Sequence, residues 1–329
     1  MKTITLPELN AAVKRGEISP LYIIKGEDAY FKSRAAEIVK GLISSDFAVM
    51  NLSVYESRPD MAELLIALST EPVFSEHRAV LVSEWTEKLS VKEKAALNGF
   101  FENPPEFSVL AVFDGADAFS ESIQGGAAAK FAVTVDCKKA DRSDIINWIK
   151  IKGARAGVLF DEAAAVRLAE FTRCDMTRVA TETEKIIAFS DGRVSVADIE
   201  SLVVPELEVQ IFELANALSG TSPERAWGLL SSIERLGYKE THILGAVTAQ
   251  FRRMYYSAES DETEYALAKK LGVKEFSVCA SREAGRRYRP NVLKRCVEML
   301  DEQEFLLKSG KISKDHMMRD IVARLISAK

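Results

Sequence analysis

The sequence predicts an α/β N-terminal domain with a parallel sheet, followed by two all-α domains. Over residues 1–137, short apolar runs alternate with helix-like stretches. Apolar runs without polar alternation are typical of parallel strands that helices cover on both faces. After Asp136 the strand-like runs stop, and helical spacing continues along the rest of the chain. We therefore divide the chain into residues 1–137, 138–205 and 206–329.

The expected strands and helices of the first domain alternate along the chain. Apolar runs predict strands at Leu21–Ile24, Met50–Tyr55, Ala79–Val82, Ser108–Phe113 and Phe131–Val135. Helical spacing of apolar residues predicts helices at Ala29–Ile43, Met61–Leu68 and Val91–Phe101.

The second domain is expected to be a small helical bundle. Its predicted helices are Ser143–Ile151 with Ser143 as N-cap, Asp161–Arg173, Met176–Ser190, and a short helix from Ser195 to Leu202. The third domain is predicted to be helical throughout, with helices at Glu208–Leu218, Pro223–Arg235, Thr241–Tyr256, Glu262–Leu271, Lys274–Arg287, Pro290–Leu307 and Lys314–Ala328.

Composition excludes several classes of protein. The 329 residues include 44 basic and 49 acidic side chains and are 47% apolar, which is typical of a folded globular protein. No apolar run approaches the roughly 18 residues of a membrane span, and the N-terminus lacks the pattern of a secretion signal, so we expect a cytoplasmic protein. The four cysteines, Cys137, Cys174, Cys279 and Cys296, lack the short spacing of zinc sites. We expect no metal and no cofactor.

The turn after the first strand is where a nucleotide-binding fold would hold phosphate. Gly26, Lys32 and Ser33 stand in register with the P-loop pattern, but Phe31 replaces its second glycine. The Phe31 side chain would occupy space that a phosphate needs, and the acidic turn before it, which includes Asp28, would repel the anion. The sequence therefore predicts a degenerate P-loop.

A nucleotide site would also need adjacent acidic residues at the end of a core strand. Ser83 precedes Glu84 after one strand, and Asp114 is followed by Gly115 after another, so neither place offers an acidic pair. The sequence also lacks the G-x-S-x-G, H-E-x-x-H and G-x-G-x-x-G patterns. We predict no catalytic residues.

The stretch Ser69–Arg78 carries Val73 and Phe74 among polar neighbours. An exposed aliphatic and aromatic pair on a polar loop is the kind of anchor that fills a partner's pocket. The alternative is that Phe74 packs into the core of its own domain, and the sequence alone favours that alternative.

The stretch from Ala266 to Arg295 has the outline of a helix-turn-helix with an arginine-rich second helix. Its arginines could contact phosphates or a protein partner; they are Arg282, Arg286, Arg287 and Arg289. Such an outline also occurs in ordinary helical hairpins, in which a basic face is solvated or paired with acids.

Taken in order, these features resemble the delta subunit family of the bacterial DNA polymerase III clamp loader. The segments that carry the resemblance are Leu21–Phe31, Trp148–Ile149, Glu182–Lys185, Ile211–Leu218, Ile243–Gly245, Gln250–Arg252 and Leu267–Val273. The resemblance implies an AAA+-like first domain, a helical lid domain and a helical collar domain. It also implies a protein that does not hydrolyse ATP, and that binds and opens the beta sliding clamp for loading onto primed DNA.

The same resemblance places the family's clamp anchor on Val73 and Phe74, with valine where the family has leucine. It implies a hetero-pentamer with gamma/tau and delta-prime subunits, formed through the collar. One alternative is an active P-loop ATPase, the motor subunit of a clamp loader. The family's motor subunits carry a four-cysteine zinc site and a Ser-Arg-Cys finger in the AAA+ part, and this sequence has neither. The other alternative is a DNA-binding helix-turn-helix regulator.

Overall fold

The computed structural model describes residues 1–219, 223–273, 275–312 and 317–328. They form two compact units, Met1–Leu159 with Cys174–Gly192, and Phe160–Arg173 with Arg193–Lys329. The predicted division at residues 137 and 205 stays a prediction, because the helices between these positions are shared by the two units. Within the described ranges, no helix is both long and apolar enough to cross a membrane.

A parallel sheet forms the centre of the first unit. Its strands are β1 (Lys2–Thr5), β2 (Leu21–Lys25), β3 (Leu52–Tyr55), β4 (Arg78–Val82), β5 (Ser108–Phe113) and β6 (Ala132–Asp136). Their order across the sheet is β1-β6-β2-β5-β4-β3, and every neighbouring pair is parallel. The predicted α/β class with a parallel sheet is therefore confirmed.

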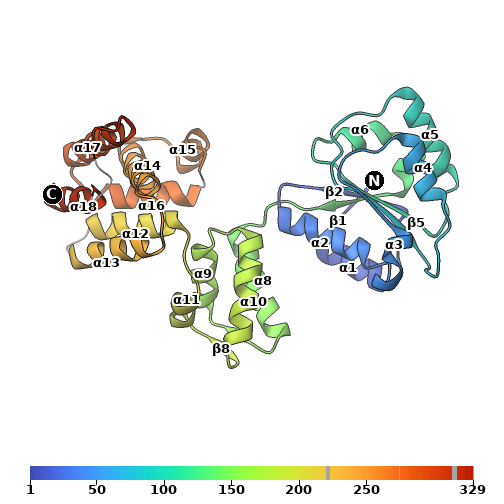
Figure 1. Ribbon diagram of the computed structural model, residues 1–329, viewed down its shortest axis with the longest axis horizontal. Coiled ribbons are helices and arrows are strands. Elements are labelled where there is room, and N and C mark those ends of the chain that lie inside the picture. The colour runs from blue at the N-terminus through green and yellow to red at the C-terminus, as the bar shows by residue number, and fades with distance from the viewer. Residues whose placement is uncertain (220–222, 274, 313–316, 329) are drawn as a thin grey trace. The chain divides into compact units, whose positions relative to one another are not determined.

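Helices cover both faces of this sheet (Figure 1). They are α1 (Leu6–Lys14), α2 (Ala29–Lys40), the short η1 (Ser45–Phe47) and α3 (Ala48–Asn51), α4 (Met61–Ser69), α5 (Val91–Glu102), α6 (Ala118–Ile123) and α7 (Ala128–Phe131). Successive side chains of a strand point to opposite faces. Leu21 and Ile23 accordingly pack with α4, α5 and α6, whereas Tyr22 and Ile24 pack with α1 and α2.

The structure corrects three sequence predictions in this unit. The sequence did not predict β1 and α1, although β1 forms an edge of the sheet. The expected strand Met50–Tyr55 begins only at Leu52, because its first residues belong to α3. The helix expected at Ser143 is capped by Asp141, whose carboxylate accepts a hydrogen bond from the Asp144 amide at 2.8 Å.

The first unit also contains α8 (Arg142–Arg155) and α10 (Met176–Phe189), which pack against each other. α10 also contacts α2. The Trp148 ring of α8 meets the Tyr30 ring of α2 edge to face, with centroids 5.9 Å apart. This aromatic contact joins α8 to the helix that follows the P-loop-like turn.

The N-terminus of α5 gives a pH-dependent contribution to stability. The Glu93 carboxylate accepts hydrogen bonds from the Ser90 hydroxyl at 2.6 Å and the Ser90 amide at 2.8 Å, and it pairs with Arg58. These contacts lower the pKa of Glu93 to about 2. Because the pKa is lower in the folded state, the ionised Glu93 carboxylate stabilises the fold above the unfolded pKa of about 4.3, and this contribution is lost as pH falls towards 2.

Urea denaturation should therefore show a smaller loss of stability between pH 5 and pH 2 in Glu93→Gln than in the wild type. Equal losses would contradict this assignment.

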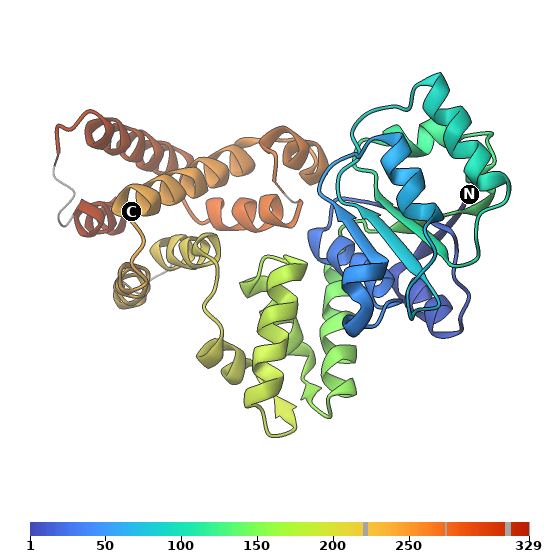
Figure 2. The ribbon, with the colours of Figure 1, turned by 45° about the vertical axis from the view of Figure 1, so that its right-hand side comes forward.

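The second unit is mainly helical. Its helices are α9 (Glu162–Phe171), α11 (Val196–Leu202), α12 (Leu207–Ser219), α13 (Pro223–Arg235), α14 (Glu240–Glu259), α15 (Glu264–Leu271), α16 (Glu275–Gly285), α17 (Pro290–Lys308) and α18 (Met317–Ser327). The short strands β7 (Leu159–Phe160) and β8 (Arg193–Val194) pair with each other. The long helix α14 lies against α16 and α17 (Figure 2).

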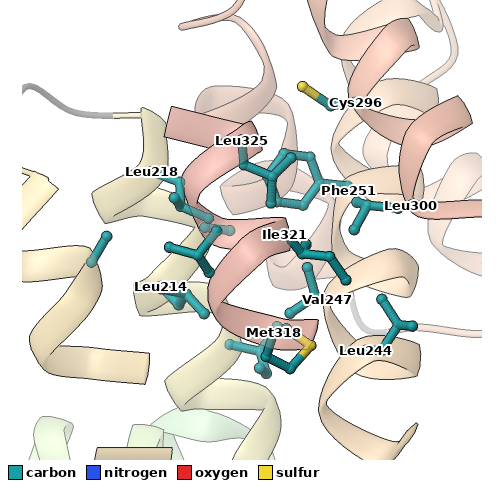
Figure 3. Close-up of a cluster of buried hydrophobic side chains, with 14 of the residues drawn as sticks. Leu214, Leu218, Leu244, Val247, Phe251, Cys296, Leu300, Met318, Ile321 and Leu325 are labelled. Carbon is teal, nitrogen blue, oxygen red and sulfur yellow. The ribbon is translucent and has the colours of Figure 1, made fainter. Parts of the chain in front are cut away.

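One hydrophobic core joins α12, α14, α17 and α18 (Figure 3). Leu214 of α12, Phe251 of α14 and Ile321 of α18 are buried in it. The helix predicted from Lys314 is described from Met317, and residues 313–316 lie outside the described part. The helical prediction for the C-terminal third is confirmed.

Candidate functional site

The anchor loop, residues 70–77, joins α4 to β4 and carries Val73 and Phe74. It lies at the amino-terminal end of β4, and η1 and α3 lie at the amino-terminal end of β3. The two strands are parallel neighbours, with Leu52 opposite Ala79, so both segments lie at the amino-terminal end of the strands. The P-loop-like turn follows the carboxyl end of β2 and therefore lies at the opposite end of the strands.

Phe74 is exposed to solvent rather than packed into the core. It is 81% exposed, and Val73 is 41% exposed. The expectation from the sequence alone, that Phe74 packs inside its own domain, is therefore wrong. The φ of Phe74 is +51°, in a left-handed region that few residues other than glycine adopt.

Contacts within the domain hold the anchor loop in this form. The Phe74 ring lies against the Phe47 ring of η1, with centroids 5.8 Å apart. The Asn51 side chain of α3 bonds to both backbone groups of Val73: its Oδ1 accepts from the amide at 2.7 Å, and its Nδ2 donates to the carbonyl at 2.8 Å. One ring contact and two hydrogen bonds therefore join η1 and α3, which precede β3, to the anchor loop, which precedes β4.

Further apolar side chains are exposed on the helices beside the anchor loop. Val49 and Met50 of α3 and Ile66 of α4 are exposed. Exposed apolar side chains gathered on neighbouring elements are typical of protein interaction surfaces. No pattern in the sequence predicted that these three residues would be exposed. The only signal for Ile66 is its position on α4, away from the buried face of Met61 and Leu64.

The P-loop-like turn is packed tightly by the segment after β6. Gly26 has φ +130°, and a Cβ there would lie 2.2 Å from the carbonyl carbon and oxygen of Cys137. The Cys137 amide donates to the Lys25 carbonyl at 2.6 Å, and its carbonyl accepts from the Asp28 amide at 3.0 Å. Burial raises the pKa of the Cys137 thiol to about 12. Gly26 is thus explained by close backbone packing, without a phosphate.

The N-terminus of α2 already has an anionic cap. The buried Asp28 carboxylate accepts a hydrogen bond from the Phe31 amide at 3.1 Å, where a P-loop would offer such amides to phosphate. The Phe31 ring packs against the core on the α1 and α2 face. Lys32 and Ser33 follow on α2, with Ser33 exposed. The turn therefore keeps the P-loop spacing, but at the N-terminus of α2 the Asp28 carboxylate accepts the hydrogen bond that a P-loop would offer to phosphate.

The acidic residues after β4 and β5 do not form a paired site. Glu84 is exposed. Asp114 is buried and accepts from the amides of Phe119 at 3.2 Å and Ser120 at 2.8 Å, so it caps α6. Among the residues that the structure describes, no group of three His, Cys, Asp or Glu side chains could hold a metal ion.

Arg282 is engaged within the second unit. Its guanidinium donates to the carbonyls of Ser257 and Glu262, each at 2.8 Å, and so ties α16 to the end of α14. Arg287 is exposed and pairs with Glu283 at 3.0 Å. Of the four predicted arginines, Arg282 thus has a structural role that its position in the sequence did not reveal.

The other two arginines of that group, Arg286 and Arg289, are exposed. α16 packs along α14. A Cβ at Gly285 would lie 2.6 Å from the Met254 carbonyl oxygen, which shows how closely the two helices approach. This contact uses one face of α16, whereas Cys279 and Glu283 of the same helix are exposed.

Comparisons with known proteins agree with this arrangement. The family model described as DNA polymerase III, delta subunit, matches residues 22–132, and a second model, for the C-terminal domain of the DNA polymerase III delta subunit, matches residues 208–325. The DNA polymerase III subunit delta of Bacillus subtilis (strain 168) is 22% identical over 332 residues, covering 96% of this chain and 95% of that one.

A solved structure shows the same fold. The Bacillus subtilis DNA clamp loader delta protein (YqeN) superposes with a TM-score of 0.71 at 19% identity, covering 98% of this chain and 99% of that one. This likeness agrees with the predicted α/β domain with a parallel sheet, followed by a mainly helical part. Because the two family models match in the expected order along the chain, this protein belongs to the DNA polymerase III delta subunit family.

Proposed function

We propose that this clamp-loader subunit binds the beta sliding clamp through Val73 and Phe74 and promotes opening of the ring for loading onto primed DNA. We further propose that it does so without hydrolysing ATP. The observation that supports this proposal most directly is the exposure of Phe74 on a loop that its own domain holds in place. An aromatic side chain that the domain leaves 81% exposed is suited to fill a pocket on a partner.

The affinity would come mainly from burial of apolar surface. Burying a phenylalanine and a valine side chain contributes about 3–5 kcal/mol before ordering costs. Ring opening requires more than affinity, because a ligand shifts an equilibrium only by the difference between its affinities for the two states. The subunit must therefore bind the open clamp more tightly than the closed clamp.

The test is a pair of measurements with the full chain and the beta sliding clamp of the same organism. Surface plasmon resonance should show saturable binding to immobilised clamp. The protein alone, without ATP, should also release clamps from nicked circular DNA, because the opened ring can leave the duplex. Binding without release would contradict the ring-opening role, and absence of binding would overturn the proposal.

The P-loop-like turn supports a role without ATP hydrolysis. The Asp28 carboxylate accepts a hydrogen bond at the N-terminus of α2, and the Cys137 backbone packs against Gly26, in the turn that would bind phosphate in a P-loop. Isothermal titration with ATP and magnesium should therefore give no binding at micromolar nucleotide. Micromolar binding would contradict this and would favour the alternative, an active motor subunit.

We propose that the partners are gamma/tau and delta-prime subunits, assembled through the C-terminal collar in a three-domain protein divided near residues 137 and 205. The apolar faces of α12 and α18 are buried in the chain's own core, so the collar contact must use other faces. The exposed Arg286 and Arg289 are the candidates for contact with a partner or with primed DNA in the assembled loader. Arg287 could join them only by giving up its pair with Glu283.

A further inference from the structure

We propose that Asn51 is the positioning residue of the clamp-binding site, which it serves by fixing the backbone of the anchor loop. This inference rests on the proposed function. Asn51 is the last residue of α3 and is fully buried, with no exposed surface. It cannot itself touch a clamp, so its influence on binding must act through the residues to which it bonds.

The amide of Asn51 is used almost completely by hydrogen bonds within the site. Its Oδ1 accepts from the Val73 amide at 2.7 Å, and its Nδ2 donates to the Val73 carbonyl at 2.8 Å and the Phe47 carbonyl at 3.0 Å. The side chain thus pairs with both backbone groups of Val73, as a neighbouring strand would. A buried amide is stable only with such partners, so the arrangement couples burial of Asn51 to one conformation of the loop.

Fixing Val73 also fixes the residue after it. Phe74 adopts φ +51°, a conformation that costs free energy for an aromatic residue and persists only where the surroundings impose it. The two Asn51 bonds hold the peptide groups on both sides of Val73, and the second of these is the one that precedes Phe74. The Phe47 ring then supports one side of the Phe74 ring, and Phe47 also accepts from Asn51 through its carbonyl.

Arg78 makes further hydrogen bonds between the elements beside the anchor loop. Arg78, the first residue of β4, donates from Nε to the Ala67 carbonyl at 2.6 Å and from Nη1 to the Met50 carbonyl at 2.7 Å. It therefore joins the end of α4 to α3 beneath the anchor loop. With these supports the loop is ordered before any partner arrives, and binding avoids much of the ordering cost. Asn51 is the part of this assembly that reaches the loop itself.

The experiment compares Asn51→Ala and Asn51→Asp with the wild type in surface plasmon resonance against the immobilised beta sliding clamp. We expect Asn51→Ala to weaken binding about ten-fold, because the competent loop conformation becomes a minority state and the apparent affinity falls in proportion. Asn51→Asp keeps an acceptor for the Val73 amide but loses both donors, and it should weaken binding as well. It provides a second variant that removes the donors without leaving the cavity that alanine creates.

Two further readouts separate positioning from general loss of structure. In hydrogen exchange, the Val73 amide should lose its protection in Asn51→Ala while the amides of β4 stay protected. In the Phe74→Ala background, adding Asn51→Ala should weaken binding much less than it does in the wild type, because the larger of the two side chains that Asn51 positions is already gone.

The matched control is Asn98→Ala in α5. Asn98 also joins two segments of the first unit, because its Oδ1 accepts from the Ala128 amide at 3.3 Å, but it does not contact the anchor loop. Its substitution should leave clamp binding unchanged. The role of Asn51 would be overturned if Asn51→Ala bound the clamp with wild-type affinity. It would also be overturned if Asn51→Ala weakened binding by the same factor in the Phe74→Ala background as in the wild type. Either result would leave the proposed function standing. Absence of clamp binding by the wild type would instead overturn the proposed function and this inference with it.

Discussion

Replacing Phe74 with alanine is expected to weaken binding to the beta sliding clamp at least about thirty-fold, equivalent to about 2 kcal/mol. Phe74 offers a large apolar surface that is 81% exposed in the free chain, and burial of that surface in a partner would supply much of the binding free energy. The fold should tolerate the change, because so exposed a side chain contributes little to the core. Surface plasmon resonance with the full chain measures the affinity, and circular dichroism checks the fold.

The matched control for this prediction is Phe189→Ala. Phe189 is the same residue type in the same unit and is 71% exposed, but it ends α10, in a different part of the sequence from the anchor loop. It should bind the clamp as the wild type does. If Phe74→Ala remains folded and binds the clamp with wild-type affinity, Phe74 is not the anchor. If both variants weaken binding equally, general surface hydrophobicity explains the effect better than a specific site.

The sequence predicts the sheet well because its central strands are buried on both faces. Runs such as Val109–Val112 contain no polar side chain, and every residue in them packs against a helix. The edge strand β1 lacks this signal, because only Ile4 of its four residues is buried. An edge strand with a half-exposed pattern resembles a loop in sequence, which explains why β1 was missed.

Side-chain roles that depend on distant partners could not be predicted in the same way. The exposure of Phe74 depends on Asn51, which lies 22 residues earlier than Val73 and shows no motif of its own. Arg282 looks like a surface arginine in the sequence, yet it donates to the Ser257 carbonyl of α14 and to the Glu262 carbonyl in the loop after α14. In both places the decisive information is a tertiary hydrogen bond, which neither residue type nor periodicity encodes.

Gly26→Ala is expected to destabilise the first unit by about 3 kcal/mol, the second large effect. An added Cβ would lie 2.2 Å from the Cys137 carbonyl carbon and oxygen, so the backbone after β6 would have to move. That backbone is held by a hydrogen bond from the Cys137 amide to the Lys25 carbonyl at 2.6 Å. The residue would also have to keep φ +130°, which alanine rarely adopts. Urea denaturation followed by tryptophan fluorescence measures the loss.

Gly16→Ala measures the cost of a positive φ in the ordinary left-handed region, without close packing. Gly16 also has a positive φ, +76°, but no atom lies within 4 Å of an added Cβ, so only the backbone cost of about 1 kcal/mol remains. A loss in Gly26→Ala no larger than in Gly16→Ala would contradict the packing argument.

The first glycine of the P-loop-like turn has a different role here from the one it has in a nucleotide-binding protein. In a working P-loop, the first glycine is retained because backbone amides must approach phosphate, and its loss would weaken nucleotide binding. Here its loss should appear as instability in a protein without nucleotide, because the close approach that Gly26 allows is to Cys137.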